Sequence, residues 1–545
     1  MATTLSAPLE TGAARSPRLD HDFPPAGRWV FLAVMVAGLA FAGFSIFSDT
    51  REVGEGLALG TFAFLTLALL IALGFEFVNG FHDTANAVAT VIYTHSMPAP
   101  LAVVWSGFFN FLGVMASSGA VAYSIITLLP VDLILHVGSS AGFAMIFALL
   151  LAAVLWNLAT WFVGLPNSSS HALIGSILGV GLANQLMSSG TGGTSGVDWS
   201  QATKVLTGLW MAPLIGFGAA FLLLIVMKFV LKNPKLYKEP EGNAPPPKGI
   251  RALLIFTCTA VSFAHGGNDG QKGMGLIMLI LIGCAPTAYA LNRTMPESQT
   301  PAFVASANAA SNAFQVHAKG ATVTTVDTAR DVLTQALKER KASTPQVFAA
   351  ASALSRDLGQ RIGAFGSLNK VSAAATPNLR NDMYLVLDTT RLATKDKKAA
   401  AAVFSEPELK AITGYQTNLE KGTRYIPTWV KITVALALGL GTMVGWKRIV
   451  VTVGEKIGKS HLTYGMGASA ELVAAGTIMA AEVYGLPVST THILSSGVAG
   501  ASVANGAGLQ GRTVLNMALA WVLTLPVAMA LSGGLYVLFV AITKM

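Results

Sequence analysis

Charged residues are scarce in this chain. Asp, Glu, Lys and Arg make up 12% of its 545 residues, whereas 53% are hydrophobic, and the mean hydropathy is +0.58. A water-soluble globule carries about twice that share of charge, so this composition excludes one and favours a protein embedded in a lipid bilayer. Cysteine is also rare: Cys258 and Cys284 lie at opposite ends of one apolar segment, too far apart along a helix to pair. A disulfide framework and a metal-thiolate cluster are therefore excluded.

Long apolar runs, in contrast, are abundant. A helix needs about 20 mainly apolar residues to cross a bilayer, and we count roughly eleven to twelve helical segments, including 29–47, 57–78 and 141–163. The formal net charge of +9 lies mostly in loops and tails, where positive charge marks the cytoplasmic side. This distribution predicts a multi-pass membrane protein with a cytoplasmic N-terminus, and it gives no reason to expect a nucleic-acid partner.

The chain divides by composition into segments of different kinds. A long polar stretch rich in Ala, Ser and Thr has the spacing of short amphipathic helices, as in 325–341, and its place between basic loops predicts an extracytoplasmic position. The segments are a cytoplasmic tail (1–27), a first transmembrane repeat with an extra N-terminal helix (28–227), a basic cytoplasmic linker (228–251), the start of a second repeat (252–286), a helical extracytoplasmic insertion (287–427) and the rest of the second repeat (428–545).

Two polar motifs each occur twice in the apolar segments. NGFHDTANAVAT surrounds Asp83 and HGGNDGQKGMG surrounds Asp269, while GLPNSSSH ends at His171 and GLPVSTTH ends at His492. Without the insertion, the two motif pairs have similar spacing. The sequence therefore predicts an all-α polytopic membrane protein with inverted-topology repeats, broken helices and re-entrant hairpins.

The aspartate motif places polar side chains on one stripe of a helix. Asn79, Asp83 and Asn86 share such a stripe, and His265, Asp269 and Lys272 form its counterpart. An unpaired carboxylate at the bilayer centre costs at least about 2.5–3.5 kcal/mol, so each aspartate needs a cation, a proton or hydrogen bonds. The glycines of both motifs predict broken helices that line a cavity. A salt bridge that only packs helices together is the alternative.

The hydroxyl motif begins a new helix. Its proline breaks the incoming helix, and hydroxyl side chains beside free N–H groups at a helix start suit an oxyanion. Simple helix capping is the alternative. The hydroxyl residues of the two copies are Ser168, Ser169, Ser170, Ser489, Thr490 and Thr491.

Phosphate is the oxyanion that suits this combination best. Near neutral pH it still carries hydrogens that a carboxylate can accept, whereas sulfate has none. The remaining negative charge calls for a co-bound cation, for which Asn79, Asn86 and Asn268 offer oxygen ligands. We therefore expect cation symport, and we expect arsenate, which mimics phosphate, to be carried too.

Two further carboxylates are candidate proton carriers beside the aspartates. Glu76 precedes Asp83 on the same helix, and Glu471 lies in the span before the second hydroxyl motif. A hydrogen bond that ties two helices together is the alternative for both. Four histidines also lie in the motifs, and hydrogen bonding is a simpler role for them than metal ligation, so the sequence specifies no metal site. They are His82, His171, His265 and His492.

With these four motifs in this order, the chain resembles the inorganic phosphate transporters of the Pit type, and is similar to their bacterial low-affinity members. The resemblance covers nearly all of the apolar chain. It implies a homodimeric inner-membrane carrier that binds phosphate with Asp83, Asp269 and the hydroxyl residues, and that has no tightly bound cofactor.

The resemblance also bears on the coupling ion. Sodium-coupled relatives carry Asn where this chain has Lys272, whose ammonium group could replace a sodium ion. Similar bacterial members are associated with proton coupling and with phosphate carried as a neutral complex with a divalent metal. Sodium-coupled phosphate or sulfate symport is the alternative. An intramembrane aspartyl protease is a distant one, because such an enzyme has no use for duplicated hydroxyl-bearing helix starts.

Overall fold

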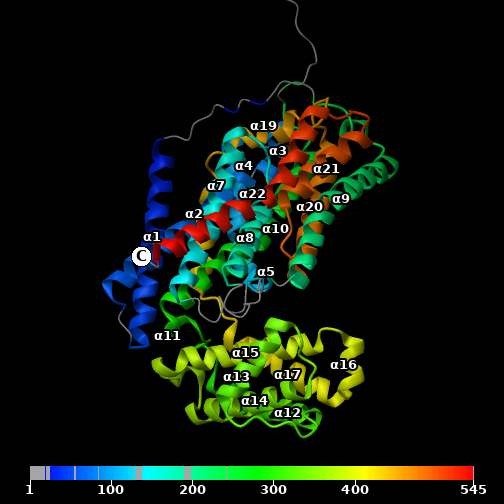
Figure 1. Cartoon of the computed structure of the whole chain (residues 1–545). Coiled ribbons are helices and arrows are strands. Elements are labelled where there is room, and N and C mark those ends of the chain that lie inside the picture. Colours follow the sequence, from blue (N-terminus) through cyan, green and yellow to red (C-terminus); the bar gives the residue numbers. More distant parts are fainter. Residues whose placement is uncertain are drawn as a thin grey trace, which may run out of the picture.

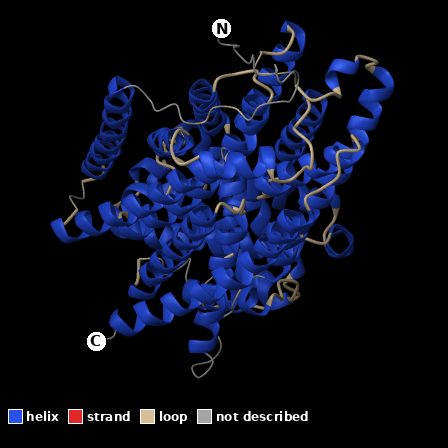
Figure 2. Ribbon diagram, turned by 90° about the horizontal axis from the view of Figure 1, so that it is seen from above, coloured by secondary structure: helices blue, strands red, loops and turns tan. Residues whose placement is uncertain are grey.

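The protein is helical throughout the part that the structure describes. The computed structural model describes residues 17, 19, 25–54, 57–83, 85–126, 128–129, 138–188, 197, 199–240, 242 and 244–543. Figure 2 shows helices and loops and no strand among these residues. The predicted all-α class is confirmed.

The first part of the chain forms long helices that pack side by side (Figure 1). They are α1 (Pro25–Glu52), α2 (Leu59–Asp83), α3 (Ala85–Tyr93), α4 (Ala99–Ala116), α5 (Ala120–Ile126), α7 (Ser140–Val163), α8 (Ser169–Ser188), α9 (Trp199–Val230), the short η1 (Pro234–Leu236) and α10 (Lys248–Cys284). After the insertion the bundle continues with α18 (Thr428–Thr442), α19 (Lys447–Glu455), α20 (Tyr464–Val483), α21 (Thr490–Ala504) and α22 (Gly511–Thr543).

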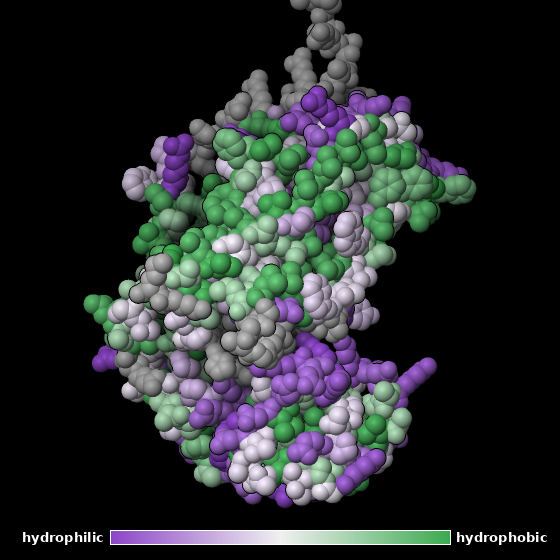
Figure 3. Space-filling view, in the orientation of Figure 1, coloured by the Kyte–Doolittle hydropathy of each residue, from purple (hydrophilic) through white to green (hydrophobic). Residues whose placement is uncertain are grey.

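Many of these helices are suited to cross a membrane. Among the described residues, eight helices are long and apolar enough, or nine if the bent pair α17 and α18 counts as one span. This is fewer than the roughly eleven to twelve segments that we expected from hydropathy, in part because α5 and α21, with 7 and 15 residues, are short. Hydrophobic side chains cover much of the bundle's surface (Figure 3), as expected for a face in contact with lipid.

The insertion forms a separate helical lobe at one end of the bundle (Figure 1). Its core contains Phe303, Leu333, Leu358 and Tyr415, all buried. Thr325 caps the helix that the pattern in 325–341 predicted. The helical insertion is thus confirmed, and its extracytoplasmic side stays a prediction. The elements are α11 (Pro286–Tyr289), η2 (Glu297–Gln299), α12 (Thr300–His317), α13 (Val326–Glu339), α14 (Pro345–Phe365), η3 (Leu368–Lys370), η4 (Ala373–Ala375), α15 (Thr376–Thr394), α16 (Lys397–Val403) and α17 (Glu406–Thr423).

The two halves of the bundle pack against each other reciprocally. Helix α2 packs on α18 while α4 packs on α10, and α8 packs on α22 while α9 packs on α21. Each pairing joins a helix of one half to the other half, and each has a counterpart with the halves exchanged. This layout fits a duplicated unit, and the inverted sense of the two copies stays a prediction.

One expectation about the aspartate motifs is wrong. Helix α10 runs without a break through Asp269, although its motif HGGNDGQKGMG contains five glycines. These glycines bring other elements close: a Cβ at Gly266 would overlap the carbonyl oxygen of Asn110, and one at Gly270 would lie 2.5 Å from Val114 Cγ2. The glycines therefore allow close helix packing, as small residues commonly do in membranes. In the first copy, α2 ends at Asp83 and α3 begins at Ala85.

Candidate functional site

The two aspartates meet in the interior of the bundle. Asp83 comes from the last residue of α2 and Asp269 from the middle of α10, and both are buried. Ser169, from the first turn of α8, lies between them: its hydroxyl donates to Asp83 Oδ2 at 2.9 Å and lies 3.4 Å from Asp269 Oδ2. Helices far apart in the sequence thus bring both carboxylates and the start of α8 to one place. We call the starts of α8 and α21, with Ser168, Ser169 and Ser170 and with Ser489, Thr490 and Thr491, the two hydroxyl tips.

Asp83 is surrounded by donors that carry no permanent charge. Thr491, from the first turn of α21, donates to its Oδ1 at 2.5 Å, so hydroxyls from both motif copies contact this one carboxylate. His82 Nδ1 lies 3.3 Å from the same oxygen. The other ring nitrogen of His82 is 3.3 Å from Thr160 Oγ1, which fixes the ring's orientation.

Asp269 is instead paired with a cation. Lys272 Nζ lies 2.6 Å from Asp269 Oδ2 and donates to Ser170 Oγ at 2.5 Å. The whole lysine side chain is buried. An ion pair in a site of low dielectric is retained only when its geometry and its further hydrogen bonds are good. Lys272 gains such a bond with Ser170, whereas Asp269 Oδ1 has no hydrogen-bond partner among the described residues.

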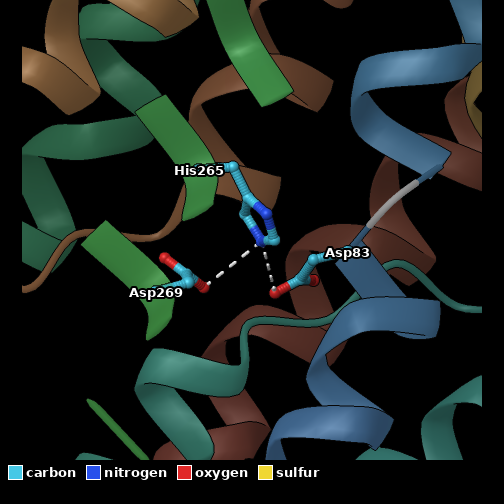
Figure 4. A group of neighbouring side chains, drawn as sticks. All are labelled: Asp83, His265 and Asp269. Carbon is cyan, nitrogen blue, oxygen red and sulfur yellow. Dashed lines mark ion pairs between the residues drawn. The ribbon is translucent and has the colours of Figure 1, made fainter. Parts of the chain in front are cut away.

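His265 links the two carboxylates, as Figure 4 shows. Its Nε2 is 3.5 Å from Asp269 Oδ2 and 4.0 Å from Asp83 Oδ2, and its Nδ1 is 2.8 Å from Asn110 Oδ1. A histidine held at one nitrogen by an oxygen acceptor presents the other nitrogen in a fixed direction. We did not identify Asn110 or Thr160 from the sequence, although a lone Asn within the apolar run WSGFFNFLG was a usable signal.

One atom each from Asp83, His265 and Asp269 could ligate a metal ion. The three candidate ligand atoms lie within 4.8 Å of one another. Carboxylate oxygens and imidazole nitrogen together suit a divalent cation. The donor set therefore fits a divalent metal ion.

The first hydroxyl residue of each tip caps its own helix. Ser168 Oγ accepts from the backbone N–H of His171 at 3.2 Å, and Ser489 Oγ accepts from that of His492 at 3.1 Å. Ser170 donates to the carbonyl oxygen of Val488 at 2.7 Å and so joins the two tips. The helix starts predicted from the two motifs are confirmed. Capping is the structural role of the first residue in each.

Asparagine side chains of the aspartate motifs make structural contacts. Asn268 donates to Leu486 O at 3.1 Å and accepts from Val488 N at 3.5 Å, which fastens the second tip to α10. Asn79 donates to Glu76 at 3.3 Å. The side chain of Asn86 lies outside the described part.

The two glutamates lie in different surroundings. Glu76 packs against α10 at Gly273, one turn from Asp269. Glu471 accepts from Thr257 at 2.5 Å. Both glutamates are fully buried.

Thr490, also buried, has a hydroxyl without a hydrogen-bond partner in the described part. The rings of His171 and His492 lie 4.5 Å apart, at the junction of α8 and α21.

Comparison with known proteins places these residues in context. A model of the "Phosphate transporter family" matches residues 79–532. The low-affinity inorganic phosphate transporter PitA of Escherichia coli K12 is 42% identical over 499 residues, covering 88% of this chain and 97% of its own length. PitB of the same organism is 40% identical over 508 residues, with the same coverage. A solved structure described as the sodium-dependent phosphate transporter aligns with a TM-score of 0.47 at 19% identity, over 88% of this chain and 100% of its own.

Proposed function

The chain belongs to the phosphate transporter family, and from this premise we propose that it imports inorganic phosphate by symport with a cation, which we take to be a proton. It is a transporter and not an enzyme, as the names of its relatives indicate. We place it in the bacterial inner membrane, with a cytoplasmic N-terminus and as a homodimer.

The observation that carries this proposal is the meeting of two buried carboxylates with two hydroxyl-bearing helix starts. Ser169 and Thr491 contact Asp83, and Ser169 also approaches Asp269. A substrate there needs oxygens that accept from hydroxyls and hydrogens that carboxylates accept. Phosphate near neutral pH offers both, and arsenate should compete with it.

The charge balance supports a proton as the coupling ion. Lys272 is a built-in cation on Asp269, so this carboxylate needs no sodium ion to balance its charge. Among the described residues, Asp83 accepts from two hydroxyls and lies near His82 and His265, and in this proposal it takes up and releases a proton as its surroundings change. Glu76 and Glu471 are further proton carriers in this proposal.

A divalent metal bound to phosphate would fit the same place. Asp83, His265 and Asp269 would ligate the metal, and the hydroxyl tips would contact the phosphate oxygens. Such a neutral complex would reduce the charge that has to cross the membrane. In this scheme the metal is cargo, and the protein holds no cofactor tightly.

Radiolabelled phosphate uptake into proteoliposomes tests the proposal, with proton, sodium and magnesium gradients varied one at a time. We expect uptake to follow an inward proton gradient, to rise with magnesium and to proceed without sodium. A requirement for a sodium gradient together with indifference to pH would favour the sodium-coupled alternative. Excess unlabelled sulfate should leave uptake unchanged, and inhibition equal to that by unlabelled phosphate would contradict the proton-based argument for the substrate.

A further inference from the structure

An apolar groove runs along the surface of the bundle, far in sequence from the hydroxyl tips. It lies between α1 on one side and α4 and α18 on the other, and its volume is about 840 Å³. Ligand sites in proteins have volumes of about 300–1,000 Å³. Val34, Val104, Phe108 and Leu436 contribute to its walls.

The groove borders the first half of α1, whose side chains are not buried. The buried residues of α1 begin at Gly38 and continue toward its C-terminal end. At Gly38 a Cβ would lie 3.0 Å from Leu436 Cδ1, so the helix is in close contact with α18 there. From Pro25 to Ala37 no side chain of α1 is buried, and residues of this stretch line the groove opposite α4 and α18.

Small residues deepen the floor of this groove. Gly107 of α4 and Gly439 of α18 both line it, and a Cβ at Gly107 would lie 2.6 Å from the carbonyl oxygen of Gly439. The two helices therefore touch through their backbones at these glycines. The larger side chains on either side of this contact form the walls of the groove.

One end of the groove is basic. Arg28 is the charged residue among those that line it. Val444, which also lies in the wall, is followed three residues later by Lys447. Basic residues at the cytoplasmic end of membrane helices bind the phosphate of anionic lipid headgroups. The groove is thus apolar along its walls and basic at one end, and a phospholipid is likewise apolar along its acyl chains and charged at its headgroup.

We propose that this groove binds one anionic phospholipid, with an acyl chain between α1 and α4 and the headgroup phosphate beside Arg28. Free phosphate would gain nothing from the apolar walls, and an uncharged lipid nothing from the basic end. The site is independent of the phosphate site in the bundle interior.

Native mass spectrometry of the full chain in detergent tests this proposal, by titration with phosphatidylglycerol and phosphatidylcholine of identical acyl chains. We expect one tightly held phosphatidylglycerol per chain, bound roughly five- to tenfold more tightly than phosphatidylcholine, as one or two basic side chains would produce. Arg28→Gln should bring the two affinities together. Lys238→Gln, which removes an exposed charge in the linker, should leave the ratio unchanged.

A tryptophan in the wall separates groove binding from general lipid adhesion. Val104→Trp should weaken the binding of both lipids, while Leu222→Trp, at an exposed position on α9, should not. If Val104→Trp does not fold, Val34→Trp in the opposite wall replaces it. Equal affinities of the wild type for both lipids would overturn the proposal. So would a groove covered by a second copy of the chain, seen as a dimer that Val104→Trp dissociates and that excludes lipid.

Discussion

The two copies of the aspartate motif pack in the same way but place differently charged groups beside their aspartates. Gly80 and Gly266, at matching places in the two motifs, each lie against a backbone of the opposite half, at Leu438 and at Asn110. The aspartates that follow them differ: Asp83 is held by hydroxyls and a histidine, and Asp269 by Lys272. The two copies thus share their glycine packing contacts but differ in the charge of the groups around the aspartate.

This difference assigns different tasks to the two carboxylates. The position that is Lys272 in the second copy is Asn86 in the first, so only Asp269 has a permanent cation on its own helix. A carboxylate already paired with a cation on its own helix needs no further counter-charge, whereas one held by hydroxyls and histidine is left to pair with an incoming cation. In the proposed cycle, Asp269 therefore shapes the site and Asp83 responds to substrate and proton.

The largest expected effects come from neutralising each aspartate. Asp83→Asn and Asp269→Asn should both abolish net phosphate uptake in proteoliposomes. Their stabilities should differ, because Asp269→Asn leaves Lys272 buried and unpaired, at a cost of about 3–5 kcal/mol. Asp83→Asn disturbs hydrogen bonds at a cost of about 1–3 kcal/mol. Thermal unfolding in detergent measures the difference.

A double variant separates charge pairing from transport in the second copy. Asp269→Asn combined with Lys272→Met removes both charges of the pair, and should recover most of the lost thermal stability while uptake stays abolished. Wild-type uptake in Asp83→Asn or Asp269→Asn would refute the roles given to these residues. Equal melting temperatures of the two single variants would show that the copies are electrostatically alike.

Making the second copy resemble the first should change the cation requirement. Lys272→Asn removes the ammonium group and leaves Asp269 without a cation on its own helix. We expect uptake to fall at least roughly tenfold in sodium-free buffer, which corresponds to about 1.4 kcal/mol, and to recover in part when sodium is added. Uptake measured against sodium concentration gives the result, with Lys228→Gln in α9 as the control. No sodium response at all would show that Lys272 does not replace a bound cation.

The hydroxyl tips offer a finer comparison, between residues that contact Asp83 and residues that cap helices. Ser169→Ala and Thr491→Val remove donors to Asp83 and should lower uptake roughly tenfold each, as the loss of a hydrogen bond to a charged group predicts. Ser168→Ala and Ser489→Ala should instead lower thermal stability by about 1 kcal/mol and affect uptake less. Concentration dependence of uptake distinguishes them, and equal losses in all four variants would argue against separate roles.

Much of this arrangement could be predicted from the sequence because it repeats. The duplicated motifs predicted the helix starts at Ser169 and Thr490 and drew attention to both aspartates. The continuity of α10 could not be predicted, since glycine breaks a helix or admits a neighbour depending on packing that only the folded chain defines, as at Gly266 and Asn110. The task of Asn268 was hidden for the same reason: its partners at Leu486 and Val488 are more than two hundred residues away.

The smallest expected effect concerns a carboxylate outside the membrane helices. Glu408, in the first turn of α17, accepts from the backbone N–H of Ser405 at 2.7 Å and lies 3.2 Å from His317 Nε2. The hydrogen bond from Ser405 is the main cause that holds the pKa of Glu408 below its ordinary value. A depressed pKa means that the stabilisation is present above the unfolded pKa of about 4.3 and is lost as the pH falls through the lower folded value.

Glu408→Gln should therefore loosen the start of α17 at pH 7, and this effect should disappear once the pH falls below the lowered pKa of the wild-type carboxyl. The expected cost at neutral pH is about 0.3–1 kcal/mol, typical of a carboxylate near a helix N-terminus. Hydrogen exchange of the first turn of α17 in the full chain, corrected for the intrinsic rate at each pH, measures it. Glu406→Gln, in the same turn and exposed, is the matched control. An effect of Glu408→Gln that persists unchanged at low pH would mean that side-chain shape, and not charge, stabilises this helix start, in contrast to the aspartates inside the bundle.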